Sequence, residues 1–236
     1  NGVTVVDGAA KEPEITDLAG FMTACGAQIS GAGTDRIVIR GKEKLCGAEH
    51  SVMPDRIAAV TYMCCAAVTG GELILSGADI GHIGAVVPVF KEMGCRVYSF
   101  GKDSIYIKAP ERLKAPHTIR TMPYPYFPTD AQAPLMAVCT VAFVENIFDN
   151  RYRHVSELLR MGAKIKTEGR VAVVQGVRRL SAAELVSPDL RGGAALVIAA
   201  LCAEGTSTIG GISHIDRGYE AIEKSLYSVG ADIRRI

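Results

Sequence analysis

The sequence has almost no excess of charge and no long hydrophobic run. Its 26 Lys and Arg residues nearly balance 25 Asp and Glu residues, and the formal net charge is +1. It therefore has no strongly basic field that would attract nucleic acid. The longest apolar stretch, residues 194–203, is well short of the ~20 residues that span a bilayer, and the N-terminus does not resemble a signal peptide. We expect a soluble, cytoplasmic protein that binds neither nucleic acid nor membrane.

The sequence also lacks motifs for metals and phosphate loops. Its seven cysteines are odd in number and form no CxxC pair, and no His, Cys and Asp residues have a metal-binding spacing. The pairs Gly192-Gly193 and Gly210-Gly211 are too short for a P-loop or a dinucleotide-binding loop. We expect reduced thiols in the core, no metal and no cofactor.

One short pattern recurs four times at a fixed spacing. Gly-[Ala/Cys]-x-[Ile/Val] begins at Gly26, Gly94, Gly162 and Gly230, and successive copies lie 68 residues apart. Each glycine stands where a helix should stop and a strand begin, a common place for a left-handed residue. A fixed period indicates a chain built from copies of one supersecondary unit, and this period is long enough for several elements per copy.

A second pattern predicts a buried helix in three of the copies. Pro54-Asp55, Pro128-Thr129-Asp130 and Pro188-Asp189 precede apolar runs at residues 57–68, 132–142 and 192–203. An aspartate at this place can accept from the unpaired N–H groups of a helix start. Because the runs are apolar nearly all round, we expect each helix to be buried on every side.

Strands and amphipathic helices fill the rest of each copy. We expect strands at residues 72–76, 143–147 and 206–210, amphipathic helices at 83–93, 154–161 and 219–229, and hairpins within 27–40, 96–108 and 163–174. The unit reads β-α-β-α-β-β, an α/β fold. The last copy reaches Ile236 with one hairpin strand, residues 232–236, so we expect another segment to supply its partner.

Five motifs along this repeat carry a family resemblance. They are Glu12-Pro13-Glu14-Ile15, Gly31-Ala32-Gly33-Thr34-Asp35, Phe127-Pro128-Thr129-Asp130-Ala131-Gln132, Asp149-Asn150-Arg151 and His214-Ile215-Asp216-Arg217-Gly218-Tyr219-Glu220. Over almost all 236 residues the chain resembles the C-terminal part of the UDP-N-acetylglucosamine enolpyruvyl transferases. The resemblance implies two inside-out α/β domains, barrel-like, with buried helices and sheets outside. Residues 1–50 would finish one domain, and residues 51–236 would form most of the other.

The resemblance also implies a reaction and its partners. The family transfers the enolpyruvyl group of phosphoenolpyruvate to the 3-hydroxyl of UDP-N-acetylglucosamine, the first committed step of peptidoglycan synthesis. The N-terminal half of the same enzyme would supply the last strand and a reactive cysteine, so this chain alone should be inactive. The chemistry needs a base near the hydroxyl, an acid for the methylene carbon, and cations for the phosphate and carboxylate.

Asp130 is the candidate base, by its match to the family's Pro-Thr-Asp motif. The residues alone also allow a plain helix cap, since Asp55 and Asp189 hold similar places. Arg217 is the candidate clamp for phosphoenolpyruvate, because a guanidinium grips carboxylate or phosphate with two hydrogen bonds. A solvated arginine is the alternative for Arg217.

Three further residues are candidates for substrate binding. Arg191 offers a second inward-facing guanidinium. Arg151 has the same chemistry, although Asp149 could hold it in a structural ion pair. Ile147 would contribute backbone contacts to the uridine nucleotide, by family position only. His154 and His214 precede amphipathic helices, where core or capping roles are more usual than catalysis.

Two departures from the family pattern bear on these expectations. Ala142 joins Phe143 directly where the family has a short turn, so about five residues are expected to be missing there. Pro134 replaces a glutamine, which the first helical turn tolerates. Two alternatives stay open: the sister enolpyruvyl transferase of the shikimate pathway, and a non-catalytic binding module of the same fold. The aromatic segment from Pro123 to Phe127 favours a nucleotide sugar over the small anionic acceptor of the sister enzyme.

Overall fold

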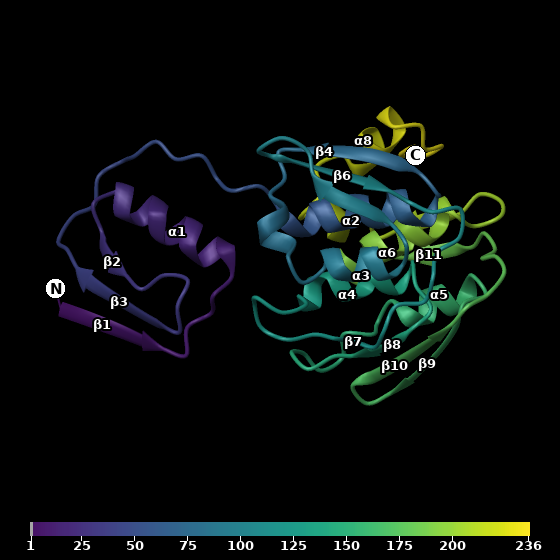
Figure 1. Ribbon diagram of the computed structural model, residues 1–236, viewed down its shortest axis with the longest axis horizontal. Helices are drawn as coiled ribbons and strands as arrows, with labels where there is room; N and C mark the ends of the chain where they lie inside the picture. Colours follow the sequence, from purple (N-terminus) through teal and green to yellow (C-terminus); the bar gives the residue numbers. More distant parts are fainter. Residues whose placement is uncertain (1) are drawn as a thin grey trace. The chain divides into compact units, whose positions relative to one another are not determined.

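The computed structural model describes residues 2–236 and divides them into two compact units (Figure 1). The small unit comprises the chain as far as Pro54 together with Pro123–Tyr126. The large unit comprises Asp55–Met122 and Phe127–Ile236. No helix in residues 2–236 is long and apolar enough to cross a membrane.

The small unit is one helix beside a three-stranded antiparallel sheet. Its elements are β1 (Gly2–Asp7), α1 (Pro13–Ala24), β2 (Gln28–Ser30) and β3 (Arg36–Gly41), and the strand order is β1-β3-β2. The expected hairpin within residues 27–40 is therefore confirmed as β2 and β3. Strand β1 pairs with β3 along its whole length and was not expected.

Three buried helices form the centre of the large unit, as the apolar runs predict. They are α2 (Arg56–Val68), α4 (Gln132–Met136) and α6 (Leu190–Leu201), and each contacts the other two. All five residues of α4 are buried, and so are most of those in α2 and α6. Many of these residues are alanine or glycine, so the helices can approach closely.

The sheets of the large unit lie outside these helices (Figure 1). One sheet has the order β4-β6-β5, from β4 (Glu72–Ser76), β5 (Arg96–Ser99) and β6 (Ser104–Lys108). The next has the order β7-β8-β10-β9, from β7 (Ile119–Arg120), β8 (Ala142–Val144), β9 (Lys164–Glu168) and β10 (Val171–Gln175). The third pairs β11 (Glu184–Val186) with β12 (Thr208–Gly210). The predicted inside-out α/β fold is thus confirmed.

Short helices connect the strands. They are η1 (Ile80–Ile83), α3 (Val87–Glu92), η2 (Thr129–Ala131), α5 (Val155–Arg160), α7 (Ser213–Asp216) and α8 (Ile222–Ser228). The run β7-α4-β8-α5-β9-β10 is one full β-α-β-α-β-β copy in a single sheet. The four repeat glycines have φ values from +87° to +98°, so each adopts the expected left-handed conformation at the end of its helix.

The third buried helix is shorter than the sequence predicts. Helix α4 ends at Met136 instead of extending to residue 142, and Ala142 already belongs to β8. The third copy has 14 positions from its proline to the next strand, against 18 in the second copy and 20 in the fourth. Residues 137–141 are needed to reverse the chain, so the helix gives up its last turns. The Ala142–Phe143 junction therefore lies inside a strand.

The expected strand at residues 232–236 is wrong for this structure. A strand requires a paired neighbour, and β12 pairs only with β11 among the described strands. The segment is held instead by Arg235, whose guanidinium donates to both carboxylate oxygens of Asp216 at 2.7 and 3.1 Å and to Glu223 at 3.2 Å.

Candidate functional site

Asp130 lies in η2, at the start of the buried helix α4, and its carboxylate meets two guanidinium groups. Oδ1 forms an ion pair with Nη2 of Arg151, and Oδ2 accepts from Nη2 of Arg191 at 3.2 Å. The Asp130 side chain is 39% exposed, whereas those of Arg151 and Arg191 are 23% and 13% exposed. The structure thus brings three of the five predicted site residues together.

The cap interpretation of Asp130 does not hold. Asp55 accepts from the backbone N–H groups of Ile57 and Ala58 at 2.8 and 2.9 Å, and Asp189 accepts from Gly192 at 2.8 Å. Those two carboxylates cap α2 and α6. The start of η2 has no side-chain cap, and the carboxylate of Asp130 turns toward the arginines. Asp130 is the second residue after its proline, whereas Asp55 and Asp189 each directly follow theirs. Its carboxylate is therefore available for another role.

Arg191 is held from behind by Tyr219. Its Nη1 donates to the Tyr219 hydroxyl at 3.1 Å, and the guanidinium lies 5.8 Å from the centre of the tyrosine ring. The same hydroxyl lies 2.8 Å from Oγ1 of Thr61 in α2, and both Tyr219 and Thr61 are buried. Burial works against the charged guanidinium, but the neighbouring Tyr219 and Asp130 outweigh it and raise the pKa of Arg191. The group therefore stays charged.

Arg151 takes no part in the ion pair that the sequence allows with Asp149. Asp149 accepts instead from Nη2 of Arg170 at 2.8 Å. The guanidinium of Arg151 lies 5.3 Å from the centre of the Phe148 ring, a cation–π geometry, and pairs with Asp130. This alternative for Arg151 is therefore wrong.

Several polar atoms at the site lack a partner. Nε of Arg151, Nε of Arg191 and Oε1 of Gln132, the first residue of α4, are buried without a hydrogen bond to a described residue. Buried polar atoms normally have partners, so an unmet group at a site calls for a ligand or water. Two guanidinium groups face the carboxylate of Asp130, and Asp55 also lies close enough to Arg191 to help raise its pKa. The arrangement suits an anionic, hydrogen-bonding ligand.

Arg217 and Ile147 lie outside this cluster. Arg217 follows α7, is exposed, and forms no ion pair with another described residue. It stands two residues before Tyr219, which contacts Arg191. The backbone N–H of Ile147 donates to Oε1 of Glu145 at 2.9 Å. Any backbone contact of Ile147 with a ligand therefore falls to its carbonyl.

His154 and most of the cysteines are core residues, as the sequence predicts, whereas His214 and Cys46 are exposed. His154 is 1% exposed, and burial, opposed by Asp189 and aided by Arg151, lowers its pKa to about 4. Five of the seven cysteines are buried, and burial raises the pKa of Cys65 to about 12. Within residues 2–236 no disulfide forms and no cluster of His, Cys, Asp and Glu could hold a metal ion.

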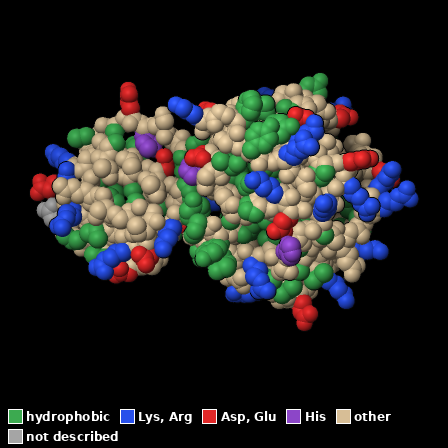
Figure 2. All heavy atoms as spheres, viewed as in Figure 1, with side chains coloured by type: hydrophobic (Ala, Val, Ile, Leu, Met, Phe, Trp, Pro, Cys, Tyr) green, Lys and Arg blue, Asp and Glu red, His purple; other side chains and the backbone are tan. Residues whose placement is uncertain are grey.

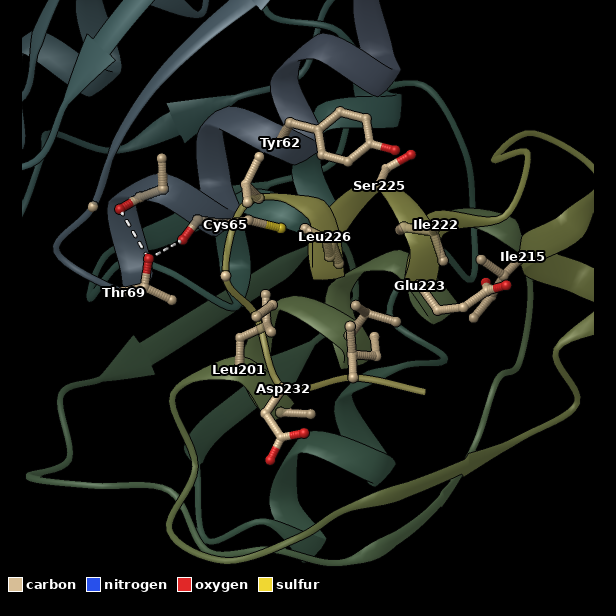
Figure 3. Close-up of a pocket in the computed structure, with 18 of the residues that line it drawn as sticks. Tyr62, Cys65, Thr69, Leu201, Ile215, Ile222, Glu223, Ser225, Leu226 and Asp232 are labelled. Atoms are coloured by element: carbon tan, nitrogen blue, oxygen red, sulfur yellow. Dashed lines mark hydrogen bonds between the residues drawn. The ribbon is translucent and has the colours of Figure 1, made fainter. Parts of the chain in front are cut away.

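A cavity of the large unit is separate from the Asp130 cluster. It has a volume of about 1200 Å³ and is lined by α2, α6, α8 and residues 229–236. Figure 3 shows Leu201, Ile222 and Leu226 around it, with the carboxylates of Glu223 and Asp232 beside them. Neither Asp130 nor the two arginines reach it. Its lining includes Arg234 and Arg235, but carboxylates outnumber these two arginines, so the cavity suits a phosphate poorly and we place the candidate site at Asp130.

Sequence reasoning missed the residues that hold the cluster. Tyr219 belongs to a quoted motif, but nothing in the sequence shows that its hydroxyl would meet Arg191. Thr61 and Glu145 lie in apolar surroundings in the sequence, and a polar residue inside a buried run is the one signal that could have singled them out.

Known proteins match the whole chain. The family model of EPSP synthase (3-phosphoshikimate 1-carboxyvinyltransferase) matches residues 1–226. UDP-N-acetylglucosamine 1-carboxyvinyltransferase 2 of Caldanaerobacter subterraneus subsp. tengcongensis is 51% identical over 241 residues, which covers 100% of this chain and 58% of that protein. UDP-N-acetylglucosamine 1-carboxyvinyltransferase of Acidobacterium capsulatum is 51% identical over 240 residues, with 100% of this chain and 55% of that protein covered.

The 241 aligned positions exceed the 236 residues of the chain by five, so the chain lacks at least five positions of the first relative. The short α4 is one place where residues are fewer than in the sister copies. The crystal structure of the enolpyruvyl transferase NikO from Streptomyces tendae superposes with a TM-score of 0.88 at 27% identity, covering 99% of this chain and 57% of that one. The chain spans little more than half the length of these relatives. It belongs to the EPSP synthase family of enolpyruvyl (1-carboxyvinyl) transferases.

Proposed function

We propose that the protein containing this chain transfers the enolpyruvyl group of phosphoenolpyruvate to the 3-hydroxyl of UDP-N-acetylglucosamine. The observation that carries the proposal is 51% identity, over the whole chain, to proteins named UDP-N-acetylglucosamine 1-carboxyvinyltransferase. The chain spans 55–58% of the length of these relatives, so we assign the activity to a longer protein. We propose that an N-terminal half completes it. We place the reaction in the cytoplasm, as a step of peptidoglycan synthesis.

Asp130 is the proposed base. Its carboxylate is partly exposed and is held by Arg151 and Arg191. As the acceptor oxygen bonds to C2 of phosphoenolpyruvate, its proton passes to Asp130 and the methylene carbon C3 takes a proton from an acid. Loss of phosphate from C2 and of a proton from C3 then restores the double bond. A positioned base contributes typically ~10²–10⁴-fold to such a step.

The arginines are the proposed anion-binding groups. Arg191 and Arg151 each have a buried Nε that no described residue accepts from, so each can donate to a phosphate or carboxylate oxygen. Asp130 is held by the Nη2 atoms of the same two arginines, so an anionic ligand that also takes these Nη2 donors frees the carboxylate for the acceptor hydroxyl. Arg217 is the proposed clamp for phosphoenolpyruvate, and Ile147 contributes its carbonyl to the nucleotide.

The sister reaction is the second candidate. The matching family model is described by the shikimate-pathway enzyme, whose acceptor is 3-phosphoshikimate. The aromatic segment before Asp130 favours a nucleotide sugar, and it includes the exposed Tyr126. A non-catalytic member of the family is the third possibility and would bind an acceptor without turnover.

Calorimetric titration separates these candidates. The complete protein is titrated with UDP-N-acetylglucosamine and, separately, with 3-phosphoshikimate. We expect saturable binding of the nucleotide sugar and at least a hundredfold weaker binding of the shikimate. The reverse order of affinities would contradict the proposed acceptor. Release of phosphate on later addition of phosphoenolpyruvate then distinguishes an enzyme from a non-catalytic binding protein.

A further inference from the structure

A second carboxylate near the candidate site, that of Glu145, is almost completely buried. Glu145 directly follows β8 and is 1% exposed. It forms no ion pair with a residue of the described chain. A buried charge without a cation is costly unless hydrogen-bond donors surround it. The hydrogen-bond donors around Glu145 therefore indicate the role of this carboxylate.

Four donors meet the two carboxylate oxygens. Oε1 accepts from the Thr121 hydroxyl and the Ile147 backbone N–H, each at 2.9 Å, and from the Phe148 N–H at 3.1 Å. Oε2 accepts from the Thr129 hydroxyl at 2.9 Å. All four are within hydrogen-bonding distance of a single planar group.

The donors come from three segments, and Thr121 belongs to the one that follows β7. Thr129 precedes Asp130 in η2, whereas Ile147 and Phe148 belong to the loop after β8. The ring of Phe148 lies against the guanidinium of Arg151. Glu145 therefore links two segments. One is the turn that carries the proposed base. The other is the loop that contains Ile147, the proposed nucleotide contact, and Phe148, whose ring lies against Arg151.

The parallel strands explain how these groups meet. Strands β7 and β8 pair in parallel, so Thr121 and Glu145 leave the sheet at the same edge. The Thr121 hydroxyl also accepts from the Asn146 N–H at 2.9 Å. Moving η2 would leave Oε2 without a donor, and moving the loop after β8 would remove two of the three donors to Oε1, so the two segments are fixed relative to each other.

We infer that Glu145 is a positioning residue whose carboxylate sets the place of Asp130 relative to the loop at Ile147. The inference rests on the proposed function, because it gives Asp130 the role of base. It assigns no contact between Glu145 and a substrate. The hydrogen bond from Thr129 to Glu145 positions the base alone, whereas the hydrogen bonds from Ile147 and Phe148 position the loop after β8.

A pair of substitutions at Thr129 tests the link to the base. Thr129→Val keeps the methyl group and removes the hydroxyl, whereas Thr129→Ser keeps the hydroxyl and removes the methyl group. In the complete protein we expect kcat to fall roughly ten- to a hundredfold in the valine variant, the effect of losing one hydrogen bond to a charged group. The serine variant should stay within about threefold of the unaltered protein, and the affinity for the nucleotide sugar should change little in either.

A packing role for Thr129 predicts the opposite order, with the serine variant worse than the valine variant, and that result would overturn the inference. Thr69→Val is the matched control. Its hydroxyl donates to the Cys65 carbonyl at 2.8 Å at the end of α2 (Figure 3), and it makes no hydrogen bond to Glu145. It should leave kcat within about twofold.

A double-mutant cycle and an exchange measurement complete the test. Glu145→Gln keeps an oxygen for the loop and replaces the charge-assisted hydrogen bond with Thr129 by a weaker one between an amide and a hydroxyl, so adding Thr129→Val to it should lower kcat by less than Thr129→Val does in the unaltered protein. Full additivity of the two losses would contradict a shared hydrogen bond. Amide hydrogen exchange at Ala131 and Gln132 should rise about tenfold in Thr129→Val and not in Thr129→Ser. This readout needs no turnover, so it tests the link to Glu145 even if the unaltered protein transfers no enolpyruvyl group and the proposed function fails.

Discussion

Asp130 is the side chain on which the proposed chemistry depends. Asp130→Asn keeps the shape of the side chain but cannot take a proton, so turnover of the complete protein should fall by ~10²–10⁴-fold. Steady-state kinetics with both substrates measures the loss. The control is Asp79→Asn, because Asp79 caps η1 through a 2.8 Å bond from Gly81 and asparagine caps equally well. A loss of less than threefold in Asp130→Asn would remove Asp130 from the role of base.

Arg217 offers a cleaner test than a buried arginine. It is exposed and has no ion-pair partner within residues 2–236, so a change there should leave stability alone. Arg217→Lys keeps the charge and replaces a two-bond grip by a point charge. We expect KM for phosphoenolpyruvate to rise roughly ten- to a hundredfold with the affinity for the nucleotide sugar unchanged. Equal losses for both ligands would show that Arg217 organises the site instead.

His154 should make stability depend on pH. Burial holds its folded-state pKa at about 4, below the ordinary 6.5. Between these values the unfolded chain binds more protons, so stability is fully present above pH 6.5 and is lost as pH falls toward 4. The difference corresponds to roughly 3 kcal/mol. Urea unfolding from pH 4.5 to 7.5 should show this slope, His154→Gln should flatten it, and the exposed His214→Gln should retain it. An unchanged slope in His154→Gln would contradict the assignment.

Among the helices and strands, α6 depends most on close packing of its backbone against neighbouring residues. A Cβ added at Gly193 would lie 2.2 Å from Oγ of Ser187 and 2.6 Å from Cγ1 of Ile215. Overpacking of this kind costs typically ~1–3 kcal/mol, so Gly193→Ala should lower Tm by several degrees. Gly84→Ala is the control, because its nearest neighbour would be 3.7 Å away and its backbone is helical. Thermal unfolding that ranks the two variants equally would rule out this packing account.

The same elements show what the sequence can and cannot predict. Residues 72–76 form β4 with the expected bounds, because alternation marks the strand. Strands β5 and β6 form the expected hairpin within residues 96–108, because a glycine turn specifies it locally. Strands β7 and β11 have two and three residues, too few for a periodic signal, and pair with strands far along the chain. Helix α4 is short because the third copy has fewer residues for its return, which composition does not reveal.

The candidate site also has one part that the sequence predicts and another that it does not. Motifs singled out Asp130, Arg151 and Arg191, and the structure brings these three together. The supports of the site, Tyr219 with Thr61 and Glu145 with Thr129, join residues that are distant in the sequence. Such hydrogen bonds depend on the packing of three buried helices and a parallel strand pair, so only the folded structure identifies them.

For the molecule as a whole, the most important fact is that this chain is shorter than its relatives. Basic and acidic side chains are interspersed over the visible surface, in keeping with the net charge of +1 (Figure 2). The chain spans 58% of the first relative, and the proposed activity belongs to the complete protein.

Product analysis of the complete protein tests the central claim most directly. The protein is incubated with phosphoenolpyruvate and UDP-N-acetylglucosamine, and the nucleotide sugar is analysed by mass spectrometry together with released phosphate. The account predicts a carboxyvinyl ether on the 3-hydroxyl, formed in equal amount with phosphate and at least a hundredfold more slowly in Asp130→Asn. Modification of 3-phosphoshikimate in place of the nucleotide sugar, or no product from either acceptor, would contradict it.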